Sequence, residues 1–490
     1  MKHVTKYSIF VFLFVGMIIM SSSCKKDKFS TDIISFSTDT LKFDTIFTTL
    51  GSTTKFFTIR NTDKNPVIID EIKLAGGTNS SYRINVDGDA GTSFSNIEIP
   101  ANDSIYVFVE VTIDPNTNNL PFVLYDSIQF FSNNKQQQVI LEAYGQNAHF
   151  FDGDTIYNNT TWNNDLPFVI LNYLYIDAGA SLNINQNCTV YFGGSAALLV
   201  NGNLTINGGN DTSEAVTFRG YRLDNDISGT AYDKYPGQWL GVFFLRNSTG
   251  NINNLNLRNS SYGINAGNIS TTDNAEQNLI ALQNVNINNA PIVNISNSKI
   301  YNNLFYGIFG FNAIINGENL LVHGAAQNVL GLYYGGNYAF TNCTFYAGGN
   351  AYISHSQTPL FYASNYFVYD ENQAPLQADS TNIYIANSIL YGTLEEEIVL
   401  DDDNNNTHLL YHNFINCCIK NTNENLLSLP TFQNCFNNNP EFENITKFDF
   451  RLKDNSPCID AGSNLIPYPL TDLSGQSRTT IPDVGCYEKN

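Results

Sequence analysis

Two patterns of hydrophobic and polar positions divide the chain. Between residues 36 and 147, short runs alternate apolar and polar residues, as in Lys55-Phe-Phe-Thr-Ile-Arg60 and Ser104-Ile-Tyr-Val-Phe-Val-Glu-Val111. A period of two is typical of strands that bury one face, and polar turns separate these runs. Several such strands within about 100 residues predict a β-sandwich of the immunoglobulin type over residues 36–147.

From residue 148 onward, the pattern becomes a repeat marked by asparagine. Asn297, Asn319, Asn342, Asn365 and Asn387 are separated by 22, 23, 23 and 22 residues, and each is followed three positions later by an apolar residue. Those apolar residues are Ile300, Val322, Phe345, Val368 and Leu390, and Asn416 with Ile419 continues the pattern after an acidic insert at residues 401–406. A near-constant period of about 20 to 25 residues indicates the coils of a solenoid. Asn suits the corners of such coils because it tolerates left-handed turns and stacks as amide ladders.

Segments in both regions resemble known families. Pro66-Val-Ile-Ile69 and Leu141-Glu-Ala-Tyr-Gly145 resemble immunoglobulin-like domains of the hydin/major-sperm-protein type, which are common spacers in envelope proteins. Val190-Tyr-Phe192 and Pro236-Gly-Gln-Trp239 resemble right-handed parallel β-helix lipoproteins. We therefore predict an all-β chain, with the sandwich followed by a right-handed parallel β-helix over residues 148–449.

The C-terminal segment, residues 450–490, carries a motif of its own. Ser456-Pro-Cys-Ile-Asp-Ala-Gly462, continuing to Asp483-Val-Gly-Cys-Tyr-Glu488, is similar to a tail found on many extracellular bacterial β-helix proteins. Because the end of a solenoid exposes unpaired strand edges, we expect this segment to be a cap that covers them. The expected structural ion pairs of the cap involve Asp460, Asp472, Arg478 and Asp483.

The N-terminus has the pattern of a targeting signal. Two lysines precede the apolar run from Tyr7 to Met20, and residues 21–23 are serines that lead to Cys24. A charged start, a short apolar stretch and small residues are typical of a secretory signal peptide, here residues 1–23. The position of Cys24 resembles a bacterial lipobox, which implies acylation of Cys24, a tether over residues 24–35 and a membrane as partner. The alternative is a secreted protein in which Cys24 has no special role.

Charge and cysteine content reduce the number of expected partners and cofactors. The chain has 24 Lys and Arg against 45 Asp and Glu, a net charge of −21, which excludes nucleic acid as an expected partner. The cysteines show no zinc-ligand spacing, and Cys458 and Cys486 flank the C-terminal motif and could form a disulfide. No Asp follows Cys24 directly, which favours the outer membrane, with either side of it open.

Candidate chemistry is sparse. The β-helix fold hosts polysaccharide lyases and glycoside hydrolases, but no Lys or Arg stands between Lys299 and Lys420 to bind an acidic substrate. The acidic insert contains Asp401, Asp402 and Asp403, whose carboxylates are either solvated or a weak Ca²⁺ site. We identify no catalytic residue and no other cofactor.

An aromatic series gives the clearest binding prediction. The position four after each repeat Asn is occupied by Tyr301, His323, Tyr346, Tyr369 and Tyr391. If the preceding apolar residue points inward, this position points outward, and equivalent residues on successive coils lie about 4.8 Å apart. Such a ladder suits neutral sugars, or it only stabilises the sheet by cross-strand stacking. The sequence thus predicts a non-catalytic envelope lipoprotein that binds a glycan or surface partner, with a polysaccharide-degrading enzyme as the alternative.

Overall fold

The computed structural model describes residues 29, 34–115, 121–226, 228–267, 282, 284–368, 375–403 and 407–489. Cys24, the predicted signal peptide and Tyr369 lie outside the described residues. The chain divides into two compact units, one ending at Asn147 and the other beginning at Ala148. Within the described part of the chain, no helix is both long and apolar enough to cross a membrane.

The N-terminal unit is a sandwich of two five-stranded sheets, in the orders β1-β3-β8-β5-β6 and β2-β10-β9-β4-β7. Its strands are β1 (Ser35–Phe36), β2 (Thr40–Phe47), β3 (Lys55–Arg60), β4 (Val67–Leu74), β5 (Tyr82–Val86), β6 (Asp89–Gly91), β7 (Ser93–Ile99), β8 (Ser104–Val111), β9 (Phe122–Ser132) and β10 (Lys135–Gln146). Neighbouring strands are antiparallel except β2 and β10, which are parallel. Alternate residues such as Ile59, Val107 and Leu141 are fully buried between the sheets, which confirms the predicted sandwich.

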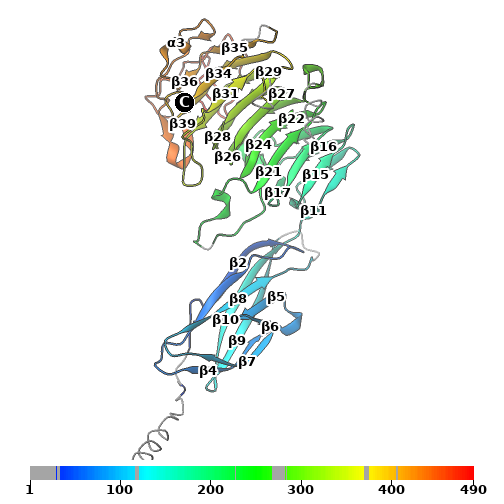
Figure 1. Cartoon of the computed structure of the whole chain (residues 1–490), viewed down its shortest axis with the longest axis vertical. Helices are drawn as coiled ribbons and strands as arrows, with labels where there is room; N and C mark the ends of the chain where they lie inside the picture. Colours follow the sequence, from blue (N-terminus) through cyan, green and yellow to red (C-terminus); the bar gives the residue numbers. More distant parts are fainter. Residues whose placement is uncertain are drawn as a thin grey trace, which may run out of the picture. The chain divides into compact units, whose positions relative to one another are not determined.

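The second unit is a parallel β-helix, and its strands stack from β11 to β36 in Figure 1. The strands form three parallel ladders. The first ladder contains β11 (His149–Phe151), β14 (Phe168–Ile170), β17 (Thr189–Phe192), β20 (Val216–Gly220), β23 (Leu255–Arg258), β26 (Lys299–Asn303), β28 (Leu321–Ala325), β30 (Thr344–Ala347), β33 (Ile389–Gly392) and β36 (Cys418–Ile419). The other two ladders belong to one 17-stranded sheet, in which the long strands β27 (Tyr306–Glu318) and β29 (Leu330–Thr341) take part in both.

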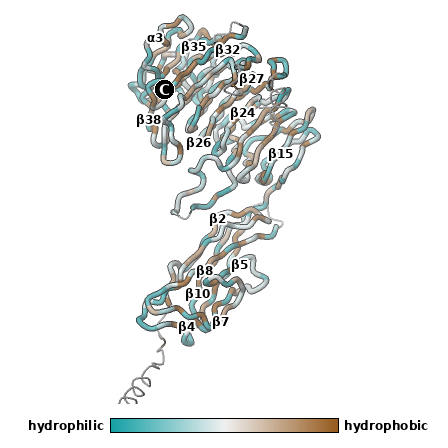
Figure 2. The backbone as a smooth tube through the Cα atoms, in the orientation of Figure 1, coloured by the Kyte–Doolittle hydropathy of each residue, from teal (hydrophilic) through white to brown (hydrophobic). Residues whose placement is uncertain are grey.

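The remaining strands of this sheet alternate along the chain between the second and third ladders. The second ladder contains β12 (Asp154–Ile156), β15 (Tyr173–Ile176), β18 (Ala197–Val200), β21 (Trp239–Phe244), β24 (Ser260–Ala266), β31 (Phe361–Ser364) and β34 (Ile398–Asp401). The third contains β13 (Thr160–Trp162), β16 (Ser181–Asn185), β19 (Asn203–Asn207), β22 (Thr249–Asn253), β25 (Ile292–Ser296), β32 (Thr381–Ala386), β35 (Leu410–Ile415) and β37 (Phe432–Gln433). Figure 2 shows hydrophobic and hydrophilic positions interleaved along the coils, as strands with one inward face require.

The repeat asparagines form corners that precede strands of the first ladder. Asn297, Asn319, Asn342, Asn387 and Asn416 all have left-handed backbone, with φ between 47° and 59°. The apolar residues three positions later, from Ile300 to Ile419, are fully buried in the interior of the coil. The corner role and the inward direction predicted for these coils are therefore both observed.

One counted repeat is wrong. Asn365 lacks the left-handed backbone of the corner asparagines, and Val368, predicted to face inward, is 44% exposed. The strand β30 pairs directly with β33, so Thr344 and its partner Ile389 are separated by one coil of 45 residues. This coil is about twice as long as the two preceding ones, which span 22 and 23 residues. Asn365 lies between β31 and β32, where it donates hydrogen bonds to Asp402 and to the carbonyl of His408.

The C-terminal segment packs over the outer surface of the first ladder, across several coils. It contains the hairpin β38 (Phe442–Asn444) and β39 (Asp449–Leu452), and Phe450 and Cys458 form a buried cluster with Leu321 and Ile389. We call this segment, from residue 440 onward, the strap. Corner asparagines bind the strap directly, since Asn319 donates to the Thr471 carbonyl and Asn342 to that of Asp483. The strap thus covers a side of the solenoid, which differs from the predicted cap over its end.

The predicted ion pairs within this segment also differ in their partners. Arg478 pairs with Glu488, whereas the carboxylates of Asp472 and Asp483 accept hydrogen bonds from backbone N–H groups. Burial raises the pKa of Asp483 to about 6. All cysteines among the described residues are free thiols, so Cys458 and Cys486 form no disulfide in this structure.

Candidate functional site

The predicted aromatic ladder exists as a row on the first ladder. Tyr301, His323, Tyr346 and Tyr391 are register partners on β26, β28, β30 and β33. Tyr301 and His323 stack with ring centres 5.2 Å apart. Tyr346 pairs directly with Tyr391, so no strand carrying Tyr369 lies between them.

The expected exposure of this row is wrong for its central members. His323 is 5% and Tyr346 9% exposed, because the strap lies over them. The His323 ring is 5.0 Å from Phe448 and 4.9 Å from Phe450, and Phe450 also lies 5.0 Å from the Tyr346 ring. The apolar strap residues make this part of the row an internal contact.

Burial, assisted by the charge of Lys299, lowers the pKa of His323 to about 3. In the unfolded chain a histidine titrates near 6.5, so between these pH values only the unfolded state binds the proton. Stability should therefore fall as the pH decreases from about 6.5. His323→Phe retains an aromatic ring between Tyr301 and Phe448 but has no group that titrates. From pH 7 to 5, we expect the free energy of unfolding of the natural protein to fall by about 2 kcal/mol more than that of this variant. Urea unfolding across this pH range is the measurement, and parallel pH profiles would contradict the assignment.

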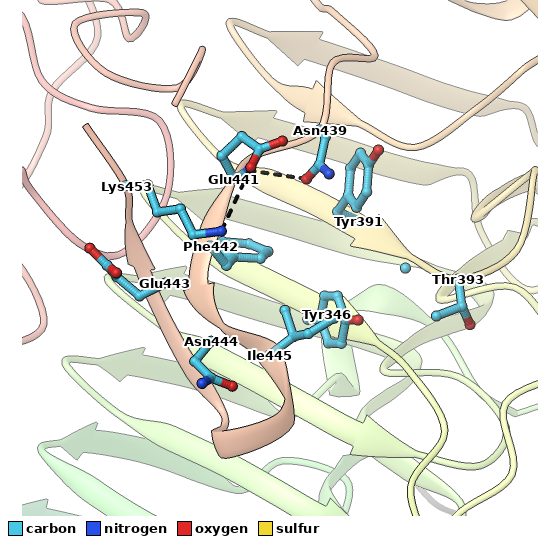
Figure 3. Close-up of a pocket in the computed structure, with 11 residues that line it drawn as sticks. Tyr346, Tyr391, Thr393, Asn439, Glu441, Phe442, Glu443, Asn444, Ile445 and Lys453 are labelled. Atoms are coloured by element: carbon cyan, nitrogen blue, oxygen red, sulfur yellow. Dashed lines mark hydrogen bonds and ion pairs between the residues drawn. The ribbon is translucent and has the colours of Figure 1, made fainter. Parts of the chain in front are cut away.

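A pocket remains open where the strap crosses the end of the row. It has a volume of about 490 Å³ and is lined by Tyr346, Tyr391, Thr393, Asn439, Glu441, Phe442, Ile445 and Lys453, among others. Figure 3 shows the two tyrosines on strands of the first ladder, with Phe442 and Ile445 contributed by the hairpin of the strap. Phe442 packs edge-on against Tyr346, with ring centres 6.0 Å apart. The pocket therefore combines aromatic walls with amide, hydroxyl and carboxylate groups.

Charges around the pocket are paired. Glu441 lies 3.8 Å from the ammonium of Lys453, and Glu443 lies 3.7 Å from that of Lys489. The side chain of Glu443 points away from both tyrosines in Figure 3. The ammonium of Lys420 lies 5.7 Å from the centre of the Tyr391 ring. Burial raises the pKa values of Tyr346 and Tyr391, so both hydroxyls are neutral hydrogen-bonding groups at neutral pH.

The three aspartates of the acidic insert do not form a common site. Asp401 accepts hydrogen bonds from the hydroxyls of Tyr362 (2.6 Å) and Tyr366 (2.8 Å). Asp402 accepts from the amide of Asn365, and Asp403 accepts from that of Gln377. Over the described ranges, no group of three or more His, Cys, Asp or Glu side chains could hold a metal ion. In this structure, Asp401, Asp402 and Asp403 instead hold side chains of neighbouring loops through hydrogen bonds.

A histidine and a glutamate form a buried pair that the sequence did not single out. The Nε2 atom of His355 lies 3.1 Å from each carboxylate oxygen of Glu397, and both side chains are fully enclosed. Glu397 also accepts hydrogen bonds from the backbone N–H groups of Leu360 and Leu394. Because a substrate cannot reach this pair, we assign it a structural role.

The outer surface of the third ladder carries a second feature that the sequence analysis missed. Asn251, Asn294 and Asn316 are register partners. The Asn294 amide donates to the side-chain oxygen of Asn251 at 3.0 Å, and the Asn316 amide donates to that of Asn294 at 2.9 Å. Three hollows of about 670, 490 and 330 Å³ follow this surface and share lining residues, including Asn207 and Asn316. The signal was available, because these asparagines recur 43 and 22 residues apart at outward strand positions.

Comparisons with known proteins give no family for this chain. No family model and no curated protein matches it. Among solved structures, a family 87 α-1,3-glucanase catalytic domain in complex with nigerose shares 11% identity over 74% of this chain and 81% of its own, with a TM-score of 0.18. A family 123 glycoside hydrolase from Clostridium perfringens shares 12% identity, with a TM-score of 0.17, and this chain spans about a quarter (26%) of its length. A PapD-like domain of human CEP192 shares 9% identity over 25% of this chain and 92% of its own, with a TM-score of 0.16.

Proposed function

We propose that this protein is a cell-envelope lipoprotein whose β-helix binds a glycan without cleaving it. The observation that carries the binding role is the pocket beside Tyr346 and Tyr391. Aromatic walls contact the apolar faces of sugar rings, and Asn, Thr and Glu groups at the rim form hydrogen bonds with hydroxyls. The pocket volume of about 490 Å³ is within the usual range for small-ligand sites.

The arrangement of carboxylates supports binding over catalysis. Glycoside hydrolysis requires two carboxyl groups that flank the same glycosidic bond, one of them an acid with a raised pKa. Among the residues that line this pocket, the carboxylates belong to Glu441 and Glu443, and each is paired with a lysine. The Glu443 side chain points away from both tyrosines in Figure 3, so the two carboxylates do not face each other across the space between the rings.

Tyr391→Ala tests the pocket directly. We expect the variant to bind glycans that the natural protein selects on an array up to about tenfold more weakly, because loss of one ring contact costs about 0.5–1.5 kcal/mol. Isothermal titration with the selected oligosaccharide measures the change. Tyr157→Ala is the matched control, since Tyr157 is 71% exposed and does not line the pocket. Equal affinity of both variants would remove the pocket from the proposal.

The anchor and the absence of catalysis need separate measurements. The natural protein should be labelled by a fatty-acid probe, and Cys24→Ala should not be labelled. Labelling that persists in this variant contradicts lipidation.

Reducing-end and unsaturated-product assays on the selected glycans decide between a binder and an enzyme. Release of either product by the natural protein would favour the polysaccharide-degrading alternative.

A further inference from the structure

The outer row of the first ladder continues from the aromatic residues to a pair of arginines. Arg258 on β23 is the register partner of Tyr301, and Arg219 on β20 is the partner of Tyr191. The pairing of Phe218 with Leu257 places Arg219 beside Arg258 on the adjacent strand. The two side chains therefore leave the same surface about 4.8 Å apart at their bases, with a tyrosine on either side.

Neither guanidinium has an acidic partner among the described residues. Within the described part of the chain, Arg219 donates to the carbonyls of Gly220 and Arg222, at 3.4 and 3.5 Å. Arg258 donates to the Tyr301 hydroxyl at 2.9 Å, and its buried Nε atom has no hydrogen-bond partner among the residues that the structure describes. By contrast, the nearby Arg222 forms a two-pronged pair with Asp224, at 2.7 and 2.6 Å.

This arrangement is unfavourable in the absence of a ligand. Like charges on directly opposite positions of a sheet repel each other, and both arginines are partly buried. Burial, and then the charge of Arg258, lowers the pKa of Arg219. The chain carries 45 Asp and Glu residues, so acidic partners are plentiful elsewhere. Two guanidinium groups on adjacent strands that lack an acidic partner suit an oxyanion, because guanidinium groups form strong charge-assisted hydrogen bonds with carboxylate and sulfate oxygens.

The flanking tyrosines limit the movement of the pair. The Arg219 guanidinium carbon lies 6.0 Å from the centre of the Tyr191 ring. Tyr301 is held by its stacking on His323, which the strap in turn covers. The Tyr301 hydroxyl that accepts from Arg258 is thus itself held in place, as a preformed binding site requires.

We propose that Arg219 and Arg258 bind the oxyanion of an acidic sugar, either a uronate carboxylate or a sulfate ester. The oxyanion part follows from the two guanidinium groups alone, and the sugar part rests on the proposed glycan-binding function. The exposed carboxylate of Asp233 attracts the Arg219 guanidinium electrostatically from beyond ion-pair distance. It therefore competes with an anionic ligand for Arg219.

The test uses the full-length protein in detergent at constant ionic strength, because salt screens such contacts. The probes are glucuronate, N-acetylglucosamine 6-sulfate, neutral glucose and inorganic sulfate, with melting temperature and calorimetric affinity as readouts. We expect a rise in melting temperature with glucuronate or with the sulfated sugar, none with glucose, and at least a tenfold loss of affinity in Arg219→Met and Arg258→Met. The probe with the higher affinity identifies the source of the oxyanion.

The stability of the unliganded variants is the second readout. Each Arg→Met change removes a repulsion, so neither should lower the melting temperature without ligand, whereas loss of a purely structural contact would lower it. Arg258→Lys retains the charge without the planar fork and should bind with intermediate affinity. Asp233→Asn should strengthen binding by removing the competitor. Arg60→Met, an exposed arginine of the N-terminal unit, should change nothing.

Three outcomes separate this proposal from the proposed function. Oxyanion binding that survives Tyr391→Ala supports a site independent of the pocket. Binding of inorganic sulfate alone, lost in both Arg→Met variants, supports the oxyanion site and removes the sugar part. Absence of any shift with either acidic sugar or sulfate, or a shift unchanged in both Arg→Met variants, overturns the proposal.

Discussion

Arg478→Met is expected to lower the free energy of unfolding of the β-helix unit by about 3–5 kcal/mol. The Arg478 guanidinium lies 3.2 Å from the Glu488 carboxylate, and both side chains are fully buried. Arg478 also donates to the side-chain oxygen of Asn319 at 2.8 Å, which ties the strap to a coil corner. The substitution leaves a buried, negatively charged glutamate without its cation, and urea unfolding measures the loss.

Arg451→Met is the matched control for this prediction. Arg451 forms a two-pronged pair with Asp449 at 2.8 and 2.5 Å, but most of its side chain is in water. An exposed pair of this kind contributes about 0–1 kcal/mol. Adding Glu488→Gln to Arg478→Met should recover part of the stability, because the uncompensated charge disappears. A cost of Arg478→Met no larger than that of Arg451→Met would show that the buried pair does not hold the strap.

Phe345→Ala should cost about 3–5 kcal/mol through the cavity it leaves in the coil interior. Phe345 is fully buried and packs edge-on against Phe340, with ring centres 5.4 Å apart. Neighbouring coils cannot close around the missing ring without moving their own strands, so most of the cavity should persist. Chemical unfolding monitored by circular dichroism measures the change.

Val368→Ala provides the comparison, because the sequence pattern gave Val368 the same inward role as Phe345. Its observed exposure of 44% predicts a loss within about 0.5 kcal/mol. If Val368→Ala lowered the free energy of unfolding by 1 kcal/mol or more, Val368 would be an interior residue. The segment would then form two coils of 22 and 23 residues, as the sequence predicted, and not one coil of 45.

Local patterns predicted the strands and corners well for a physical reason. The alternation of residues 55–60 and 104–111 matches β3 and β8 because one-sided burial imposes a period of two on each strand. The spacing of Asn319 and Asn342 predicted a coil because both residues form the same left-handed corner on successive coils. Asn365 was misassigned because a coil of 45 residues cannot be distinguished by spacing from two coils of 22 and 23.

The surroundings of the candidate sites depended on contacts that no local pattern encodes. Coverage of His323 follows from Phe448 and Phe450, which lie more than a hundred positions later in the sequence. Tyr191, Arg219 and Arg258 are separated by 28 and 39 residues, since loops of different length interrupt these coils, so no period places them in one row. The pairing of strands, rather than the spacing of residues, brings such side chains together.

The strap also has a consequence for the order of folding. Each coil of the β-helix closes on its neighbour, whereas the bonds from Arg478 to Asn319 and from Asn342 to Asp483 join residues 159 and 141 positions apart. Contacts of such high sequence separation form late, because a long loop must close before they contribute. A chain made from its N-terminus can therefore stack the coils early, while the surface around Tyr346 and Ile389 remains uncovered until the last residues arrive. Chains that end before residue 478 would retain this apolar surface in contact with water and would be prone to aggregation.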